Sequence, residues 1–163
     1  MKNQTPSRDL ERFVVAQAEV YETALWELCA GCKESHWMWF IFPQLAGLGS
    51  SVMSRRYAIS SLDEAKAYLR HPVLGSRLIE CTRAMLESGE NLSIILPYPD
   101  DLKFRSCMTL FATASEGREP FDEALLRFFG GHPDHETLKL LRESAPPFST
   151  PASNPVAQDT RTR

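Results

Sequence analysis

The segment from Ser35 to Gln44 constrains the fold more than any other part of this 163-residue chain. It reads SHWMWFIFPQ, so two indoles, two phenyl rings, an imidazole and an amide fall close together. Aromatic side chains at this density belong in a hydrophobic core. The imidazole of His36 and the amide of Gln44, however, need hydrogen-bond partners if they are buried. A polar cavity with aromatic walls satisfies both demands, and we expect a binding site here.

The conformation of this aromatic run decides which of its side chains can line the same side of a cavity. Its unbroken apolar character, its β-leaning residues and its end at Pro43 favour a short extended segment. Alternate residues of an extended chain face opposite sides, so Trp37 and Trp39 would share one face and His36 would take the other. The sequence leaves open which of the two faces borders a cavity.

The rest of the chain has the apolar spacing of helices. From Leu10 to Cys32 apolar residues recur every three or four positions, which predicts one long helix. Capping residues, prolines and glycines place six more near 53–57, 61–70, 72–89, 100–114, 120–129 and 134–143. The expected fold is mainly α, a single domain of six or seven helices over residues 9–144. Residues 1–8 are predicted to be a flexible N-terminus and residues 145–163, rich in Pro, Ser and Thr, a disordered tail.

Composition limits the classes of function. A hydrophobic share of 43% and a net charge of −3 suit a globular domain and give no support to nucleic-acid binding. No apolar run is long enough for a membrane span and the polar start has no signal-peptide core, so we expect a cytoplasmic protein without a membrane partner. The Cys29-Ala30-Gly31-Cys32 pair lacks the partners of a zinc or redox motif. No metal and no cofactor is therefore expected.

Two residues are candidates for catalysis, His36 and Asp101. Imidazole titrates near neutral pH and can act as a general acid or base, although a histidine among aromatics is more often bonded to a backbone carbonyl in the core. Asp101 can act as a base or orient a water molecule. It can equally serve the helix dipole or pair with Arg105 one turn later, and its neighbour Asp100 is fully explained as an N-cap.

Eight further residues are candidate ligand contacts. An indole can stack on a planar group, an amide can orient it through a paired donor and acceptor, and guanidinium and ammonium groups can hold an anion. The surrounding loop lacks the lysine of a P-loop. The candidates are Trp37, Trp39, Gln44, Arg55, Arg56, Tyr57, Lys103 and Arg105.

These motifs resemble an uncharacterised bacterial and fungal family, domain of unknown function 1810, over about Leu10 to Leu141. The matching motifs are Arg12-Phe13 with Ala16-Gln17, the aromatic run, Arg56-Tyr57-Ala58-Ile59, His71-Pro72-Val73-Leu74-Gly75, Asp100-Asp101-Leu102-Lys103-Phe104-Arg105-Ser106 and Phe128-Phe129-Gly130-Gly131. The resemblance implies a mainly α-helical single domain of unestablished activity. Some members carry the label calpastatin, but this chain has no Thr-Ile-Pro-Pro-type repeat of that protease inhibitor.

Two hypotheses for function follow from these residues. The first is a small-molecule-binding protein, acting without a cofactor as a hydrolase on a nucleotide-like or phosphorylated ligand. The alternative is a non-enzymatic protein-interaction module in which the aromatic run is core and the arginines form a recognition surface. The first hypothesis requires that His36, Gln44, Arg56 and Asp101 open into one cavity.

Overall fold

A computed structural model describes residues 7–117 and 120–145, and the regular elements of this part are helices. In chain order they are α1 (Ser7–Gln17), α2 (Tyr21–Ala30), α3 (Met38–Ile41), α4 (Val52–Arg56), α5 (Leu62–Arg70), α6 (Leu74–Glu87), α7 (Leu92–Ile95), α8 (Asp100–Ala114), α9 (Phe121–Phe129) and α10 (His135–Ser144). One isolated parallel β-bridge joins Leu45 to Ile59 within the described ranges. The mainly α class is confirmed. Residues 1–6 of the predicted flexible N-terminus and residues 146–163 of the predicted tail lie outside the described residues, whereas Ser7 and Arg8 begin α1.

The described residues form ten helices rather than six or seven, and three differences account for this. The long helix expected from Leu10 to Cys32 is divided into α1 and α2, the aromatic run contains α3 instead of an extended segment, and α7 forms in a short apolar patch. No glycine or proline marks the break at residues 18–20. Packing sets it instead, because α1 contacts α3 whereas α2 lies along α6.

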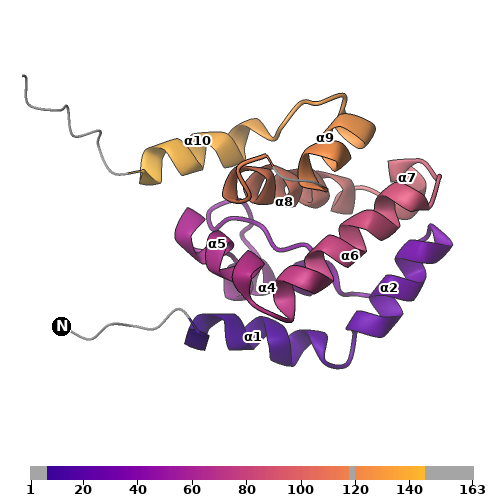
Figure 1. Cartoon of the computed structure of the whole chain (residues 1–163), viewed down its shortest axis with the longest axis horizontal. Helices are drawn as coiled ribbons and strands as arrows, with labels where there is room; N and C mark the ends of the chain where they lie inside the picture. Colours follow the sequence, from indigo (N-terminus) through magenta and orange to yellow (C-terminus); the bar gives the residue numbers. More distant parts are fainter. Residues whose placement is uncertain (1–6, 118–119, 146–163) are drawn as a thin grey trace, which may run out of the picture.

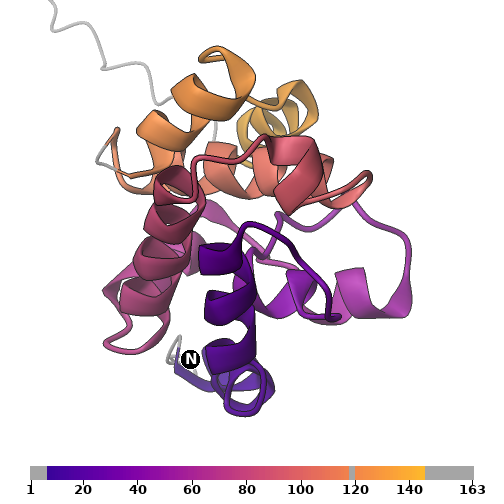
Figure 2. The ribbon, with the colours of Figure 1, turned by 90° about the vertical axis from the view of Figure 1, so that its right-hand side faces the viewer.

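Helix α8 is the central element of the arrangement. Figure 1 shows α1 on one side of the molecule and α9 and α10 on the opposite side, with α5, α6 and α8 between them. In Figure 2, turned by 90°, α2 and α6 run side by side. Helix α8 packs against α5, α9 and α10, and its residues from Ser106 to Ala112 are all buried. A helix buried on every face is typical of the centre of a domain.

Aromatic side chains link the segments of the core. Phe13 of α1 meets Tyr68 of α5 edge to face, with ring centroids 5.3 Å apart. Phe42, just after α3, meets Phe104 of α8 in the same way at 4.9 Å. Edge-to-face pairs of this kind add stability beyond the area that they bury. The aromatic run is therefore joined to α8 through the core.

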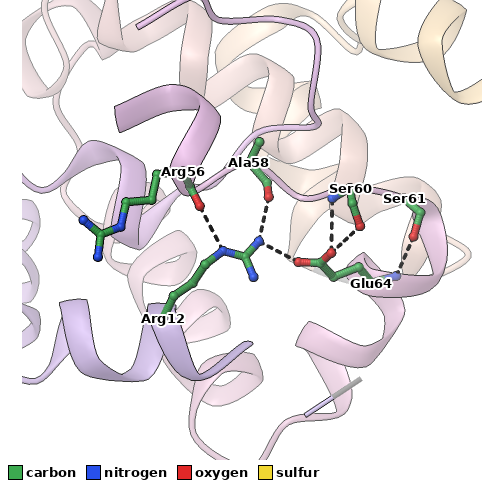
Figure 3. A network of polar contacts seen from close by, with 6 residues as sticks. All are labelled: Arg12, Arg56, Ala58, Ser60, Ser61 and Glu64. Atoms are coloured by element: carbon green, nitrogen blue, oxygen red, sulfur yellow. Dashed lines mark hydrogen bonds and ion pairs between the residues drawn. The ribbon is translucent and has the colours of Figure 1, made fainter. Parts of the chain in front are cut away.

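Arg12 joins α1 to the chain that leads from α4 into α5 (Figure 3). Its Nε donates a hydrogen bond to the Arg56 carbonyl at 3.0 Å, and its Nη2 donates to the Ala58 carbonyl at 2.7 Å. The same Nη2 lies 2.8 Å from Oε1 of Glu64. One guanidinium thus fixes two backbone carbonyls and the first turn of α5.

The predicted capping box at the start of α5 is present. The Ser61 hydroxyl accepts a hydrogen bond from the Glu64 amide at 3.1 Å. The Glu64 carboxylate reaches back to the amide of Ser60 at 3.3 Å, one residue earlier than in the usual motif. Asp134 caps α10 as expected, accepting from the Thr137 amide at 2.9 Å.

Gly75 allows the beginning of α6 to approach the end of α5. A Cβ atom at this position would lie 2.1 Å from the carbonyl oxygen of Leu69, closer than any side chain can come to backbone. Only glycine permits this approach without moving one of the two helices.

Among the helices of the described ranges, none has both the length and the apolar composition of a membrane span.

Candidate functional site

Trp37, the first indole of the aromatic run, belongs to the core. It is fully buried, and its Nε1 donates to Oε2 of Glu27 at 2.6 Å. Glu27, itself only 2% exposed, also accepts from the amides of Glu34 at 3.0 Å and Ser35 at 3.2 Å, and from the Ser35 hydroxyl. Burial acts to raise the pKa of Glu27, but these hydrogen bonds outweigh it and lower the pKa. Trp37 therefore holds the loop to α2 and has no free face for a ligand.

Trp39, two residues later, is half-buried and borders a small pocket, which we call the Trp39 pocket. Its volume is about 10 Å³, which is room for one water-sized group. The side chains around it come from α3 and the loop after it, from α4 and its end, and from the first turn of α8. They include Trp39, Phe42, Gln44, Ser54, Tyr57 and Lys103.

Three polar groups of the Trp39 pocket are available to a ligand. The Gln44 amide makes no side-chain hydrogen bond within the described part of the chain, and neither does the Tyr57 hydroxyl, although Tyr57 is only 8% exposed. The Lys103 ammonium contacts Asp100 at 3.1 Å, which leaves further N–H groups free. Ser54 differs, because its hydroxyl already donates to the N-cap carbonyl of α4 at 2.9 Å.

Asp100 holds a lysine over each indole of the aromatic run. Its Oδ2 lies 2.9 Å from Nζ of Lys33, and its Oδ1 lies 3.1 Å from Nζ of Lys103. The Lys33 ammonium is 5.2 Å from the ring centroid of Trp37, and the Lys103 ammonium is 5.1 Å from that of Trp39. Asp100 thus holds both ammonium groups against the aromatic run, and of the two lysines only Lys103 lines the Trp39 pocket.

The start of α8 differs from the sequence prediction. Asp100 is not an N-cap: Pro99 takes that position without a side-chain capping bond, and Asp100 begins the helix. The predicted pair of Asp101 with Arg105 is absent from the described ion pairs. Asp101 instead accepts from the Leu102 amide at 2.9 Å, and Arg105 donates to the His132 carbonyl at 3.0 Å. The aspartate cap was wrong because the Asp100 carboxylate pairs with Lys103 one turn later and with the remote Lys33, and so does not bond to the amides of its own helix.

Comparison with known proteins agrees with this architecture. Residues 7–141 match the model of a family described as "Protein of unknown function (DUF1810)". The chain belongs to the DUF1810 family. The resemblance seen in its sequence motifs is thereby confirmed.

A solved relative has the same DUF1810 fold. The crystal structure of the conserved hypothetical protein Rv1873 from Mycobacterium tuberculosis is similar at 52% sequence identity and a TM-score of 0.80, over 82% of this chain and 96% of that one. No match was found among curated proteins. The comparisons thus establish family and fold and name no activity.

The DUF1810 structure brings together four of the ten predicted site residues: Trp39, Gln44, Tyr57 and Lys103 line the Trp39 pocket. The other six, which do not line it, are His36, Trp37, Arg55, Arg56, Asp101 and Arg105. His36 is exposed at the surface. It is therefore neither the expected core histidine nor part of the pocket wall. The Arg56 guanidinium lies 5.5 Å from the ring centroid of Tyr57, and this contact places it beside a residue of the pocket.

Sequence reasoning missed two residues that hold the aromatic run beside the candidate site, Glu27 and Lys33. Glu27 carried a usable signal, because it lies three residues after Ala24 on the buried face of the helix, where a carboxylate requires donors. Lys33 carried none, because its partner Asp100 is remote in the sequence. The resulting pocket presents an indole, an amide, a phenol and an ammonium. These groups suit recognition of an anionic oxygen.

Proposed function

We propose that this DUF1810 protein binds a small anionic metabolite, of the nucleotide-like or phosphorylated class, at the Trp39 pocket. One observation carries the proposal: Gln44, Tyr57 and Lys103 converge on one space with donors not used up by other residues of the described chain. An anionic oxygen placed there accepts N–H and O–H hydrogen bonds from up to three directions. Charge-assisted bonds of this kind are roughly twice as strong as neutral ones.

The size of the Trp39 pocket restricts how such a ligand binds. A volume of about 10 Å³ admits one oxygen and excludes a base or sugar ring. The rest of the ligand therefore lies across the rim, where Trp39 is half-exposed and offers an indole surface to a planar group. The Arg56 side chain is exposed beside Tyr57 and can meet a second anionic group. A nucleotide fits this arrangement, with one phosphate oxygen in the pocket and the planar base against Trp39 at the rim.

The proposal is for binding, and it does not extend to the hydrolysis predicted from His36 or Asp101. Neither side chain lines the Trp39 pocket, and the described lining contains no histidine, aspartate or glutamate. The interaction-module hypothesis differs in its expected ligand, a protein in place of a metabolite. The free donors around one small, partly open space favour the metabolite.

Calorimetric titration of the full-length chain with AMP, ADP-ribose and inorganic phosphate tests the proposal. We expect saturable binding of at least one of the three, weakened about tenfold by Gln44→Leu and by Tyr57→Phe, as loss of one hydrogen bond to a charged group implies. Tyr98→Phe is the matched control, because Tyr98 is 78% exposed and does not line the pocket. Absence of binding by all three probes, or equal affinity in Gln44→Leu, contradicts the proposal.

A further inference from the structure

A second and much larger pocket lies near the other end of α8, and we call it the Glu116 pocket. It has a volume of about 470 Å³, within the range of small-molecule sites. It lies among α5, α6, the end of α8 and the start of α9, and the lining residues that matter here are Lys66, Leu69, Arg70, Ile79, Glu116 and Phe121. Ala114, which lines this pocket, lies eleven positions after Lys103 on α8, a distance of about 17 Å along the helix. The two pockets are separate sites.

The charges of the Glu116 pocket are not neutralised within the described part of the chain. Lys66 and Arg70 stand one turn apart on α5, and Glu116 follows the end of α8. None of the three takes part in an ion pair or a side-chain hydrogen bond within the described ranges. The pocket therefore offers two cations and one carboxylate, with apolar lining from Leu69 and Phe121.

The backbone at Glu116 is an independent sign that its side chain has a role. Glu116 has φ +57°, and it is the only non-glycine residue of the described ranges with positive φ. The Gly117 amide donates to the Ala112 carbonyl at 3.0 Å, and the Glu116 amide donates to that of Thr113 at 3.2 Å. This is the Schellman ending of a helix, in which glycine normally occupies the position of Glu116. The chain thus has a charged residue at a position where glycine would be less strained.

We propose that the Glu116 pocket binds a small amphipathic zwitterion. Its anionic group pairs with Lys66 and Arg70, its amine pairs with Glu116, and its apolar part contacts Leu69 and Phe121. A simple anion is attracted by the two cations but repelled by the carboxylate. A simple cation is attracted by the carboxylate but repelled by the two cations. Only a ligand with both charges satisfies all three groups, and an apolar amino acid is the smallest compound of this class.

Three related probes test the proposal by calorimetric titration of the full chain. They are L-phenylalanine, which carries both charges, 3-phenylpropanoate, which lacks the amine, and 2-phenylethylamine, which lacks the carboxylate. We expect L-phenylalanine to bind at least about threefold more tightly than either analogue, in line with one added surface ion pair. No saturable binding of L-phenylalanine, or equal affinity for all three probes, overturns the proposal.

Two substitutions at one position separate charge from strain. Glu116→Gln keeps a non-glycine residue at the left-handed backbone position but removes the negative charge. It should therefore remove the preference for L-phenylalanine over 3-phenylpropanoate. Glu116→Gly should remove the same preference and raise the melting temperature, because glycine relieves the strain. Glu123→Gln on exposed α9 surface, outside the pocket, is the control and should change neither. An unchanged preference in Glu116→Gln, or no rise in melting temperature for Glu116→Gly, overturns the proposal.

Discussion

Trp37 and Trp39 are two residues apart and each has a lysine near its ring, yet only Trp39 borders a pocket. Each indole has a lysine ammonium about 5 Å from its ring centroid, and Asp100 binds both lysines. Trp37 is fully buried with its N–H on Glu27, whereas Trp39 is half-buried beside the Trp39 pocket. The first indole therefore serves stability, and the proposed function assigns binding to the second.

Helix geometry explains how such close neighbours take different roles. Trp37 is the N-cap of α3 and Trp39 is the second residue of that helix. Each helical residue turns the chain by about 100°, so two positions along the helix face nearly opposite directions. An extended chain would have placed both indoles on the same face.

The largest expected effect distinguishes the two indoles by stability. Trp37→Ala should lower the free energy of unfolding by about 3–5 kcal/mol, because it opens a cavity in the core. It also leaves Glu27 without one of its donors. Trp39→Ala should lower the free energy of unfolding by roughly 1 kcal/mol, because the Trp39 side chain is only half-buried. Urea denaturation of both variants measures the difference, and equal losses would show that the two indoles contribute equally to stability.

A smaller loss of stability is expected when the acceptor of the Trp37 N–H is changed. Glu27→Gln should lower the free energy of unfolding by about 2 kcal/mol, because charged acceptors hold donors more strongly and the new NH₂ group faces other donors. Glu22→Gln, exposed on the same helix, is the control and should change stability by less than about 0.5 kcal/mol. A loss in Glu27→Gln no greater than in the control would show that Trp37 does not depend on Glu27.

The pH dependence of stability gives a finer test of the same carboxylate. The pKa of Glu27 is lowered from the ordinary value of 4.5 in the folded protein, so the ionised Glu27 carboxylate stabilises the fold above pH 4.5. That contribution is lost as the pH falls below 4.5 and through the folded pKa. The stability difference between wild type and Glu27→Gln should therefore be largest near neutral pH and shrink on acidification. Urea titrations between pH 7 and pH 3 measure it, and a constant difference would contradict the assignment.

The parts of the fold that could be predicted from sequence are those that local chemistry determines. The capping box at Ser61 and the cap at Asp134 are both present, since each requires only a side chain three residues from its partner amide. The break between α1 and α2 could not be predicted, because it depends on which helix each half packs against. The helix at Met38–Ile41 escaped prediction because a short apolar run does not distinguish a strand from a helix.

The candidate site could be predicted by residue type but not by position. Trp39, Gln44, Tyr57 and Lys103 were identified as candidates and do line one pocket. His36 and Asp101 were chosen for the same chemical reasons and do not line it. What separates the two groups is direction around a helix and contact across the fold, and neither is encoded in the neighbouring residues. The larger Glu116 pocket carried no motif at all, because its walls come from four separate helices and loops.

AMP binding by Lys33→Met and by Lys103→Met separates the roles of the two lysines, and so of the two indoles, directly. Both lysines pair with Asp100 and lie over an indole, but only Lys103 lines the Trp39 pocket. We expect Lys103→Met to weaken AMP binding about tenfold or more and Lys33→Met to bind AMP as the wild type does. Equal affinities in the two variants, whether both reduced or both unchanged, would show that the Trp39 pocket is not where AMP binds.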